Sequence, residues 1–307
     1  VVPGGVTEPL DPAKRDEILA LIPEAYANIK MALAWYKQIA DRFSDEIENF
    51  ANFSGAFLGM VSAEDGLEFT DGKLRLIDAD GNILLDKLEA TNFEDNFGEA
   101  VEPFSYMKFP YYKPLGYPDG AYRVGPLARL NIVTHAGTPL ADIELKQFKQ
   151  LAKGPIPGSF HYHYARLIDI LFGIEVIERI FADPSILDTH VRATAGVNRL
   201  EGSGMAEAPR GTLMHHYKVD EKGKMLWANL VIATGQNNNA MNRGVLQAAQ
   251  RYVKNDKLAD GMLNRVEAVI RTFDPCLSCS THAYGQMPLS IELLDANGAT
   301  LDEVHRS

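Results

Sequence analysis

The only two cysteines of the 307-residue chain lie close together near its C-terminal end. Two residues separate Cys276 from Cys279, and His282 follows three residues later. Thiolates are soft ligands that favour nickel, iron, zinc or copper over magnesium and calcium, and two thiolates at this spacing can bind one ion. By itself the pattern also fits half of a four-cysteine zinc site, a redox-active thiol pair, or two cysteines without any chemistry.

The residues before the cysteine pair predict how the sulfurs are presented. Pro275 has no backbone N–H and disfavours α geometry at Asp274, so the helix predicted over residues 258–272 should end here. We therefore expect a turn that presents both sulfurs. A zinc site made of two Cys-x-x-Cys knuckles needs a second knuckle, and the sequence contains none.

The stretch from Asp274 to His282, Asp-Pro-Cys-Leu-Ser-Cys-Ser-Thr-His, resembles the C-terminal metal-binding motif of the large, catalytic subunit of nickel–iron hydrogenases. It is most similar to the cytoplasmic, bidirectional, NAD-linked group. The resemblance implies a Ni–Fe centre held by four thiolates, with cyanide and carbon monoxide on the iron. It also implies that Cys276 is a terminal nickel ligand with a catalytic role and that Cys279 bridges nickel and iron.

A second segment with chemical potential is Glu-Ala-Pro-Arg-Gly at residues 207–211. Arg210 lies between Pro and Gly, which restrict the local backbone, and its charge persists at any working pH. The residues alone favour a structural ion pair with Glu207. The segment resembles the family stretch that places an Arg over the Ni–Fe site, which implies that Arg210 is catalytic and that Pro209 lines the cofactor pocket.

Two further segments carry the resemblance. Thr234 matches the family position whose hydroxyl binds an iron cyanide, although the local pattern equally allows it to cap the helix predicted from Ala240. Residues 122–131 resemble another characteristic family stretch. We interpret them as a buried connection whose Arg residues bind carbonyl and carboxylate groups.

The histidine pairs do not indicate a second metal site. His161 and His163 have no Cys or carboxylate near them in sequence, so we expect structural roles. His215 and His216 are adjacent on a predicted strand, where neighbouring side chains point to opposite faces.

Composition limits the function classes. The chain is 46% hydrophobic, and no apolar run approaches the ~18 residues that a membrane span needs. Thirty basic against 41 acidic residues give a net charge of −11, which argues against a nucleic-acid surface. Two cysteines in so long a chain suit a reducing compartment. These features and the resemblance predict a cytoplasmic protein.

The periodicity of apolar residues predicts an α+β fold of mainly long packed α-helices with small antiparallel β-hairpins, like the nickel–iron hydrogenase large subunit. We expect one long helix over residues 11–50, hairpin turns at 78–82 and 220–224, and irregular structure over 102–131. A helix follows from Tyr164 to Phe181.

The resemblance implies a domain organisation for the whole chain. Residues 1–307 would be the C-terminal portion of the large-subunit catalytic domain, in the form of an unprocessed precursor. Residues 283–307, predicted to form a hairpin, would be a cleavable C-terminal extension. Its removal by a maturation endopeptidase would let His282 bind a second ion, Mg or Fe, beneath the Ni–Fe centre.

The family's N-terminal cysteine pair and its upstream acidic residue are absent from this sequence, so the chain supplies only half of the thiolates. The resemblance implies reversible heterolytic cleavage of H₂ with an iron–sulfur small subunit, flavin-containing NAD-reducing subunits and nickel-loading proteins as partners. Iron–sulfur clusters and flavin would belong to those partners. The alternative is a non-catalytic scaffold related to quinone-reductase subunits, with zinc at the cysteine pair.

Overall fold

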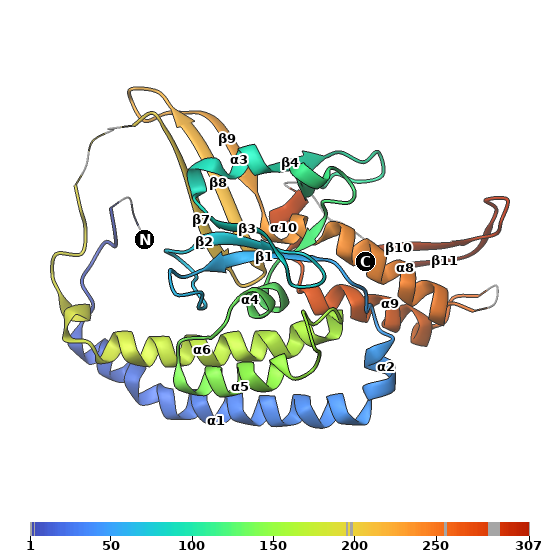
Figure 1. Cartoon of the computed structure of the whole chain (residues 1–307), viewed down its shortest axis with the longest axis horizontal. Coiled ribbons are helices and arrows are strands. Elements are labelled where there is room, and N and C mark those ends of the chain that lie inside the picture. The colour runs from blue at the N-terminus through green and yellow to red at the C-terminus, as the bar shows by residue number, and fades with distance from the viewer. Residues whose placement is uncertain are drawn as a thin grey trace.

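The computed structural model describes residues 2, 4–194, 196, 199–254, 257–281 and 289–306. Three helices, α1 (Pro12–Arg42), α5 (Pro139–Lys149) and α6 (Tyr162–Ala182), pack side by side in one layer (Figure 1). A short helix, α4 (Pro126–Ile132), lies between this layer and the central sheet. The helical layer thus covers one face of the segment that the sequence singled out at residues 122–131.

The predicted long helix α1 begins where its capping residue requires. Asp11 accepts a hydrogen bond from the backbone N–H of Ala13 at 2.7 Å, and Pro12 occupies the first turn, where a missing N–H costs nothing. The helix ends at Arg42 rather than at residue 50, because the chain turns at Phe43 into a separate short helix, α2 (Ser44–Glu48). The predicted helix over residues 11–50 was therefore too long.

The central sheet has the strand order β3-β2-β1-β6. Strand β1 pairs antiparallel with β2 and parallel with β6. Its four strands are β1 (Ala56–Val61), β2 (Lys73–Ile77), β3 (Ile83–Leu88) and β6 (Tyr122–Arg123). The predicted turn between β2 and β3 is confirmed, since Asp78 Oδ1 accepts hydrogen bonds from the backbone N–H groups of Asp80 and Asn82.

The other sheets of the described chain are small and antiparallel. A three-stranded sheet has the order β7-β8-β9, and two hairpins pair β4 with β5 and β10 with β11. Their strands are β4 (Phe97–Ala100), β5 (Phe109–Tyr112), β7 (Glu201–Ala208), β8 (Gly211–Val219), β9 (Met225–Val231), β10 (Leu289–Leu294) and β11 (Thr300–Arg306).

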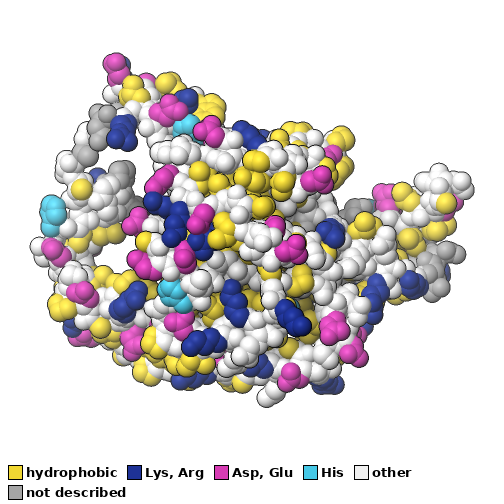
Figure 2. Space-filling view, viewed as in Figure 1, with side chains coloured by type: hydrophobic (Ala, Val, Ile, Leu, Met, Phe, Trp, Pro, Cys, Tyr) yellow, Lys and Arg dark blue, Asp and Glu magenta, His cyan; other side chains and the backbone are white. Residues whose placement is uncertain are grey.

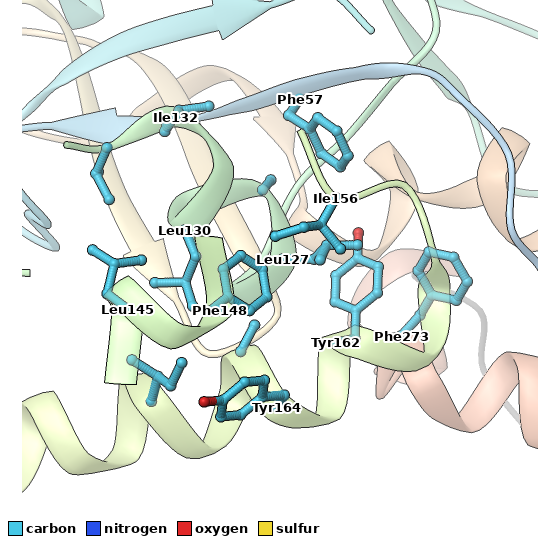
Figure 3. Close-up of a cluster of buried hydrophobic side chains, with 14 of the residues drawn as sticks. Phe57, Leu127, Leu130, Ile132, Leu145, Phe148, Ile156, Tyr162, Tyr164 and Phe273 are labelled. Carbon is cyan, nitrogen blue, oxygen red and sulfur yellow. The ribbon is translucent and has the colours of Figure 1, made fainter. Parts of the chain in front are cut away.

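The main hydrophobic core lies between the sheet and the helical layer (Figure 3). Phe57 from β1 and Leu127 from α4 meet Phe148 of α5 and Tyr162 of α6 there, and each is at most 1% exposed. Alternate residues of β1 point the other way, so Leu58 joins a second core beneath β8 and β9. Burial on both faces fixes the register of β1.

Residues 102–131 contain more regular structure than the sequence predicted. They include β5, β6 and most of α4, and the last of these was missed because all seven of its residues are buried. A helix buried on every side has no polar face, and therefore no amphipathic period for sequence reasoning to detect.

Two packed helices and a projecting hairpin lie in the C-terminal part of the chain. Helices α8 (Asn238–Tyr252) and α9 (Asp260–Phe273) pack together, and β10 and β11 extend beyond them (Figure 1). The backbone N–H of Leu258 joins this hairpin to the body by a 2.7 Å hydrogen bond to Asp302. The strands predicted in the tail are confirmed. The remaining short helices are α3 (Phe93–Asn96), α7 (Ala233–Gln236) and α10 (Leu277–Thr281).

The architecture of long packed helices with small sheets confirms the predicted fold class. Acidic and basic side chains are interspersed over the face seen in Figure 2, so neither sign gathers into a large patch on it. None of the helices in the described part of the chain combines the length and the apolar character needed to cross a bilayer.

Candidate metal centre

The cysteine pair follows directly from the end of helix α9. Asp274 caps that helix in the left-handed conformation with φ of 51°, and Pro275 then prevents the helix from continuing. Cys276 precedes the short helix α10 and Cys279 lies within it. The predicted helix end is confirmed, but only Cys276 comes from a turn as expected.

The two thiols face each other and remain accessible. Cys276 is partly exposed and Cys279 is exposed. A hydrogen bond with the Cys279 thiol lowers the pKa of Cys276, helped by Ser278, whose Oγ lies 3.6 Å from the Cys276 sulfur. The same thiol–thiol bond raises the pKa of Cys279. Of the two thiols, Cys276 is therefore the one that ionises more readily.

Arg210 lies beside this thiol pair and is held by Asp274. Its Nε donates a short hydrogen bond to the Asp274 carbonyl and lies 3.3 Å from the Asp274 carboxylate. The positive charge of Arg210 makes a small contribution in favour of the thiolate form of both cysteines, although the pKa of Cys279 is raised overall by its bond to Cys276. A single residue at the end of α9 thus holds the guanidinium next to the sulfurs.

The loop that carries Arg210 is anchored by Arg129 of α4. Arg129 is 1% exposed and donates from Nη1 to Glu207 Oε2 at 2.6 Å and from Nη2 to Asp169 Oδ2 at 2.6 Å. The same guanidinium binds the carbonyls of Ala208 and Pro209 at 3.0 and 3.2 Å. Glu207 is consequently the partner of Arg129. The ion pair between Arg210 and Glu207, which the residues alone favoured, is therefore wrong.

Close backbone packing fixes the Arg210 loop against residues 122–131. A side chain at Gly125 would begin 2.7 Å from the Arg210 carbonyl oxygen, and one at Gly211 would begin 2.4 Å from Val124. Both glycines have positive φ, 93° and 138°. Asn237 Oδ1 accepts the Val124 N–H at 2.9 Å, which joins this contact to the loop after α7.

Thr234 touches the cysteine loop directly. Its side chain is buried, and its hydroxyl accepts the backbone N–H of Cys276 at 3.1 Å. It does not cap the helix that was predicted from Ala240, because α7 already begins at Ala233 and Asn237 precedes α8. Pro209 is exposed, and its carbonyl is occupied by Arg129.

The histidines of the two pairs bind other side chains. His161 lies 3.1 Å from the Tyr36 hydroxyl, and burial lowers its pKa to about 4. His215 and His216 bind different partners: Tyr217 for the first, Glu94 and Glu201 for the second. His163 Nδ1 lies 3.3 Å from Arg166 Nη1. The structural roles expected for these histidines stay a prediction. His282 lies outside the described residues.

The thiol pair fits a soft metal as part of a ligand set. It offers two accessible sulfurs beside a fixed positive charge, and a cavity of about 270 Å³ opens next to α10, lined by Ser280 and Gly235. Within the described residues, no group of three or more His, Cys, Asp or Glu side chains could hold an ion. Further ligands would have to come from elsewhere.

Sequence reasoning missed the contacts that two supporting residues make. Asp274 was given only a backbone role, although its carboxylate and carbonyl both bind Arg210. Arg129 was expected to bind carboxylates and carbonyls, but its particular partners, 40 and 78 residues away, could not be identified. The contact between Asp274 and Arg210 could have been suggested by one signal, an Asp before Pro-Cys in a chain that also contains Pro-Arg-Gly.

The model of the family described as nickel-dependent hydrogenase matches residues 82–282. The NAD-reducing hydrogenase HoxS subunit beta of Cupriavidus necator is 39% identical over 98% of this chain and 64% of that subunit. Sulfhydrogenase 2 subunit alpha of Pyrococcus furiosus is 31% identical over 60% of this chain and 43% of its own length. The matched part of the chain thus spans less than two thirds of the length of these relatives.

Solved structures agree with the sequence matches. The crystal structure of an NAD⁺-reducing NiFe-hydrogenase in the H₂-reduced state aligns with a TM-score of 0.88 at 36% identity, over 92% of this chain and 62% of that one. A NiFeSe hydrogenase variant from Desulfovibrio vulgaris Hildenborough aligns with a TM-score of 0.66 at 21% identity, over 91% of this chain and 63% of the other. The second likeness supports the fold alone.

Proposed function

The chain belongs to the nickel-dependent hydrogenase family, and we propose that it forms the catalytic part of a nickel–iron hydrogenase that cleaves H₂ reversibly into protons and electrons. The observation that carries this proposal is the thiol pair Cys276 and Cys279, held beside Arg210 on a loop that the matched family region includes. The fold likeness to an NAD⁺-reducing enzyme favours an NAD-linked reaction.

Cys276 and Cys279 would hold the Ni–Fe centre from this chain, and two more thiolates would come from polypeptide other than this sequence. When bound, that centre supplies the heterolytic cleavage of H₂, with cyanide and carbon monoxide on its iron. Cys276 Sγ is the proposed proton acceptor, because the motif at residues 274–282 resembles the family motif in which this position is a terminal thiolate. Cys279 is the proposed bridging ligand.

Arg210 is proposed to keep positive charge beside the sulfurs throughout turnover. A guanidinium carries a permanent positive charge, and the bonds of Arg210 to Asp274 limit how far it can move. A fixed charge aimed at a reacting centre stabilises developing negative charge without reorganisation. Thr234 holds the Cys276 backbone, and Pro209 is proposed to line the cofactor pocket.

Electrons need carriers that this chain does not supply, since both of its cysteines are assigned to the metal. Curated relatives are subunits of larger hydrogenases, such as the HoxS beta subunit of the NAD-reducing enzyme. We propose an iron–sulfur small subunit and flavin-containing NAD-reducing subunits as partners, in the cytoplasm. Nickel-loading proteins and an endopeptidase would complete assembly.

The last proposal concerns the domain organisation. Residues 1–307 would be the C-terminal portion of the catalytic domain, with residues 283–307 removed during maturation. His282 would then become a ligand for a second ion, Mg or Fe.

Activity measurements on the assembled complex test the proposed function. The complex, expressed with its partner subunits and maturation proteins, should reduce both NAD⁺ and an artificial electron-accepting dye under H₂. A complex that lacks this chain should reduce neither. A nickel-loaded complex with no H₂-dependent reduction of either acceptor would contradict the proposal.

A further inference from the structure

A second cavity, of about 260 Å³, lies away from the cysteine pair, between the start of β1 and the first turns of α8. Arg123 from β6 and Arg243 from α8 both line it. The two guanidinium carbons lie 5.0 and 4.5 Å from the centre of the same ring, Phe53. Two positive charges therefore meet at one cavity wall.

Arg123 is buried without a carboxylate partner in the described part of the chain. It is 2% exposed, and it donates to two neutral carbonyls, from Nη1 to Pro157 at 2.6 Å and from Nη2 to Phe53 at 3.1 Å. Its Nε has no hydrogen-bond partner. One donor of a buried cation is thus left unsatisfied, which is costly unless a ligand binds it.

The other two buried arginines show what Arg123 lacks. Arg75 pairs with Asp65 and Asp86, and Arg129 pairs with Asp169 and Glu207. Each of them is 5% exposed or less, as Arg123 is. In this fold a buried guanidinium is normally neutralised by two carboxylates, and Arg123 is the exception among the described residues.

The space beside Arg123 suits an oxygen ligand. A side-chain atom added at Gly55 would lie at ordinary contact distance from this guanidinium, 3.9 Å from Arg123 Nη2 and 4.0 Å from Nε, so the position that the missing Gly55 side chain leaves borders this edge of Arg123. Nη2 already donates to the Phe53 carbonyl, so Nε is the donor that this edge still offers to a carboxylate oxygen. The first turn of α8, through Asn239 and Ala240, adds the positive end of a helix dipole.

Charge at the cavity is of one sign although the whole chain has a net charge of −11. None of the described residues that line it is Asp or Glu. Burial, with a smaller contribution from Arg243, lowers the pKa of Arg123 to about 10, so the group still carries its charge at neutral pH.

We propose that this cavity binds a carboxylate, which accepts a hydrogen bond from Arg123 Nε and is also attracted by Arg243. Arg243 is exposed at the cavity mouth and donates to the Ser54 carbonyl at 3.2 Å, so it can close over the ligand. The carboxylate has two sources: an Asp or Glu side chain of polypeptide that assembles with this chain, or a free small carboxylate such as acetate.

The first test is a structure of the assembled complex, determined with and without acetate. A carboxylate oxygen at about 3 Å from Arg123 Nε is expected in at least one of them. A side-chain carboxylate there identifies a polypeptide source, and a bound acetate identifies a free one. A cavity that holds only water or an apolar side chain in both structures overturns the proposal.

The second test separates the sources in solution by titrating the complex with acetate at constant ionic strength. If the ligand is free, binding saturates and Arg243→Gln weakens it about 10-fold, the loss of one charge-assisted contact. Arg251→Gln, which removes an exposed Arg from the same helix outside the cavity, should leave binding unchanged. If the site is filled by a side chain, acetate does not bind and the structure shows that side chain. Acetate binding that is equally weakened by both variants contradicts the proposal.

Discussion

The Thr234 hydroxyl accepts a hydrogen bond from the backbone N–H of Cys276 at 3.1 Å, although 42 residues separate them. Thr234 is 3% exposed, so water cannot readily replace this contact. A hydroxyl that accepts one hydrogen bond still has its own proton to donate. Thr234 can therefore hold the cysteine loop and still offer a donor to a ligand at the proposed metal centre.

Replacing Thr234 with Val should loosen the cysteine loop. The change keeps the shape but leaves the Cys276 N–H without its acceptor, at a cost of about 1–3 kcal/mol in unfolding free energy. We expect lower nickel occupancy as well, measured by elemental analysis after dialysis. Thr272→Val is the matched control, because its buried hydroxyl donates within α9, to the Val269 carbonyl. Equal nickel loss in both variants would contradict a specific role for Thr234.

Arg129→Met should destabilise the protein in a pH-dependent way. Burial already raises the pKa values of Asp169 and Glu207, and Arg129 opposes this. Without Arg129 the folded state holds protons more tightly than the unfolded state, so stability falls as pH rises from the ordinary carboxyl range. We expect the free energy of unfolding, measured with urea, to fall by roughly 3–5 kcal/mol at pH 8 and by less at pH 5.

Arg75→Met provides the comparison for that experiment. The carboxylates of its partners Asp65 and Asp86 are 36% and 43% exposed, so water can solvate them when the guanidinium is removed. The loss should therefore be smaller than for Arg129→Met. A loss of the same size in both variants, or one independent of pH for Arg129→Met, would disprove the buried-charge interpretation.

Arg210→Lys should leave the metals bound but lower H₂ turnover by roughly 10-fold or more, because a flexible ammonium does not reproduce a planar, fixed guanidinium. The structure gives the reason, since both Nε and Nη2 of Arg210 reach Asp274. Hydrogen uptake and metal content are measured on the same sample. Arg271→Lys, an exposed change on α9, should have no effect. Unchanged turnover in Arg210→Lys would return this residue to a structural role.

Maturation should shorten the chain. The tail hairpin is joined to the loop before α9 by the contact between Leu258 and Asp302, which can be released without disturbing the core. We expect the intact mass of the subunit in an active complex to correspond to a chain that ends at His282. A fully active subunit that still ends at Ser307 would show that the extension is permanent.

Local patterns predicted much of the fold because they act over a few residues. The Asp11 cap, the turn at Asp78 and the helix end before Pro275 each depend on the conformational preferences of one or two residues. The strand β7 was not expected, because Gly202 and Gly204 interrupt any apolar alternation. Antiparallel pairing with β8 from Glu201 to Ala208 holds β7 in the extended conformation that its own sequence pattern does not predict.

The site residues were harder to predict than the elements that carry them. Cys276 and Cys279 are visible from spacing, but the partners of Arg210 and Arg129 are set by packing between distant segments. Gly125 and Gly211 illustrate this, since their backbones approach the Arg210 loop and Val124 too closely for any side chain. No periodicity in a single sequence records such a contact.

Metal analysis of cysteine variants tests the central claim most directly. In the assembled complex, Cys276→Ser and Cys279→Ser should each abolish nickel retention and H₂ turnover together, because a hydroxyl does not replace a soft thiolate. Ser278→Ala, a matched control at a position between the two cysteines, should retain nickel and H₂ turnover. The account predicts nickel and iron in the wild-type chain. Stoichiometric zinc without nickel, or wild-type nickel content in either cysteine variant, would contradict it.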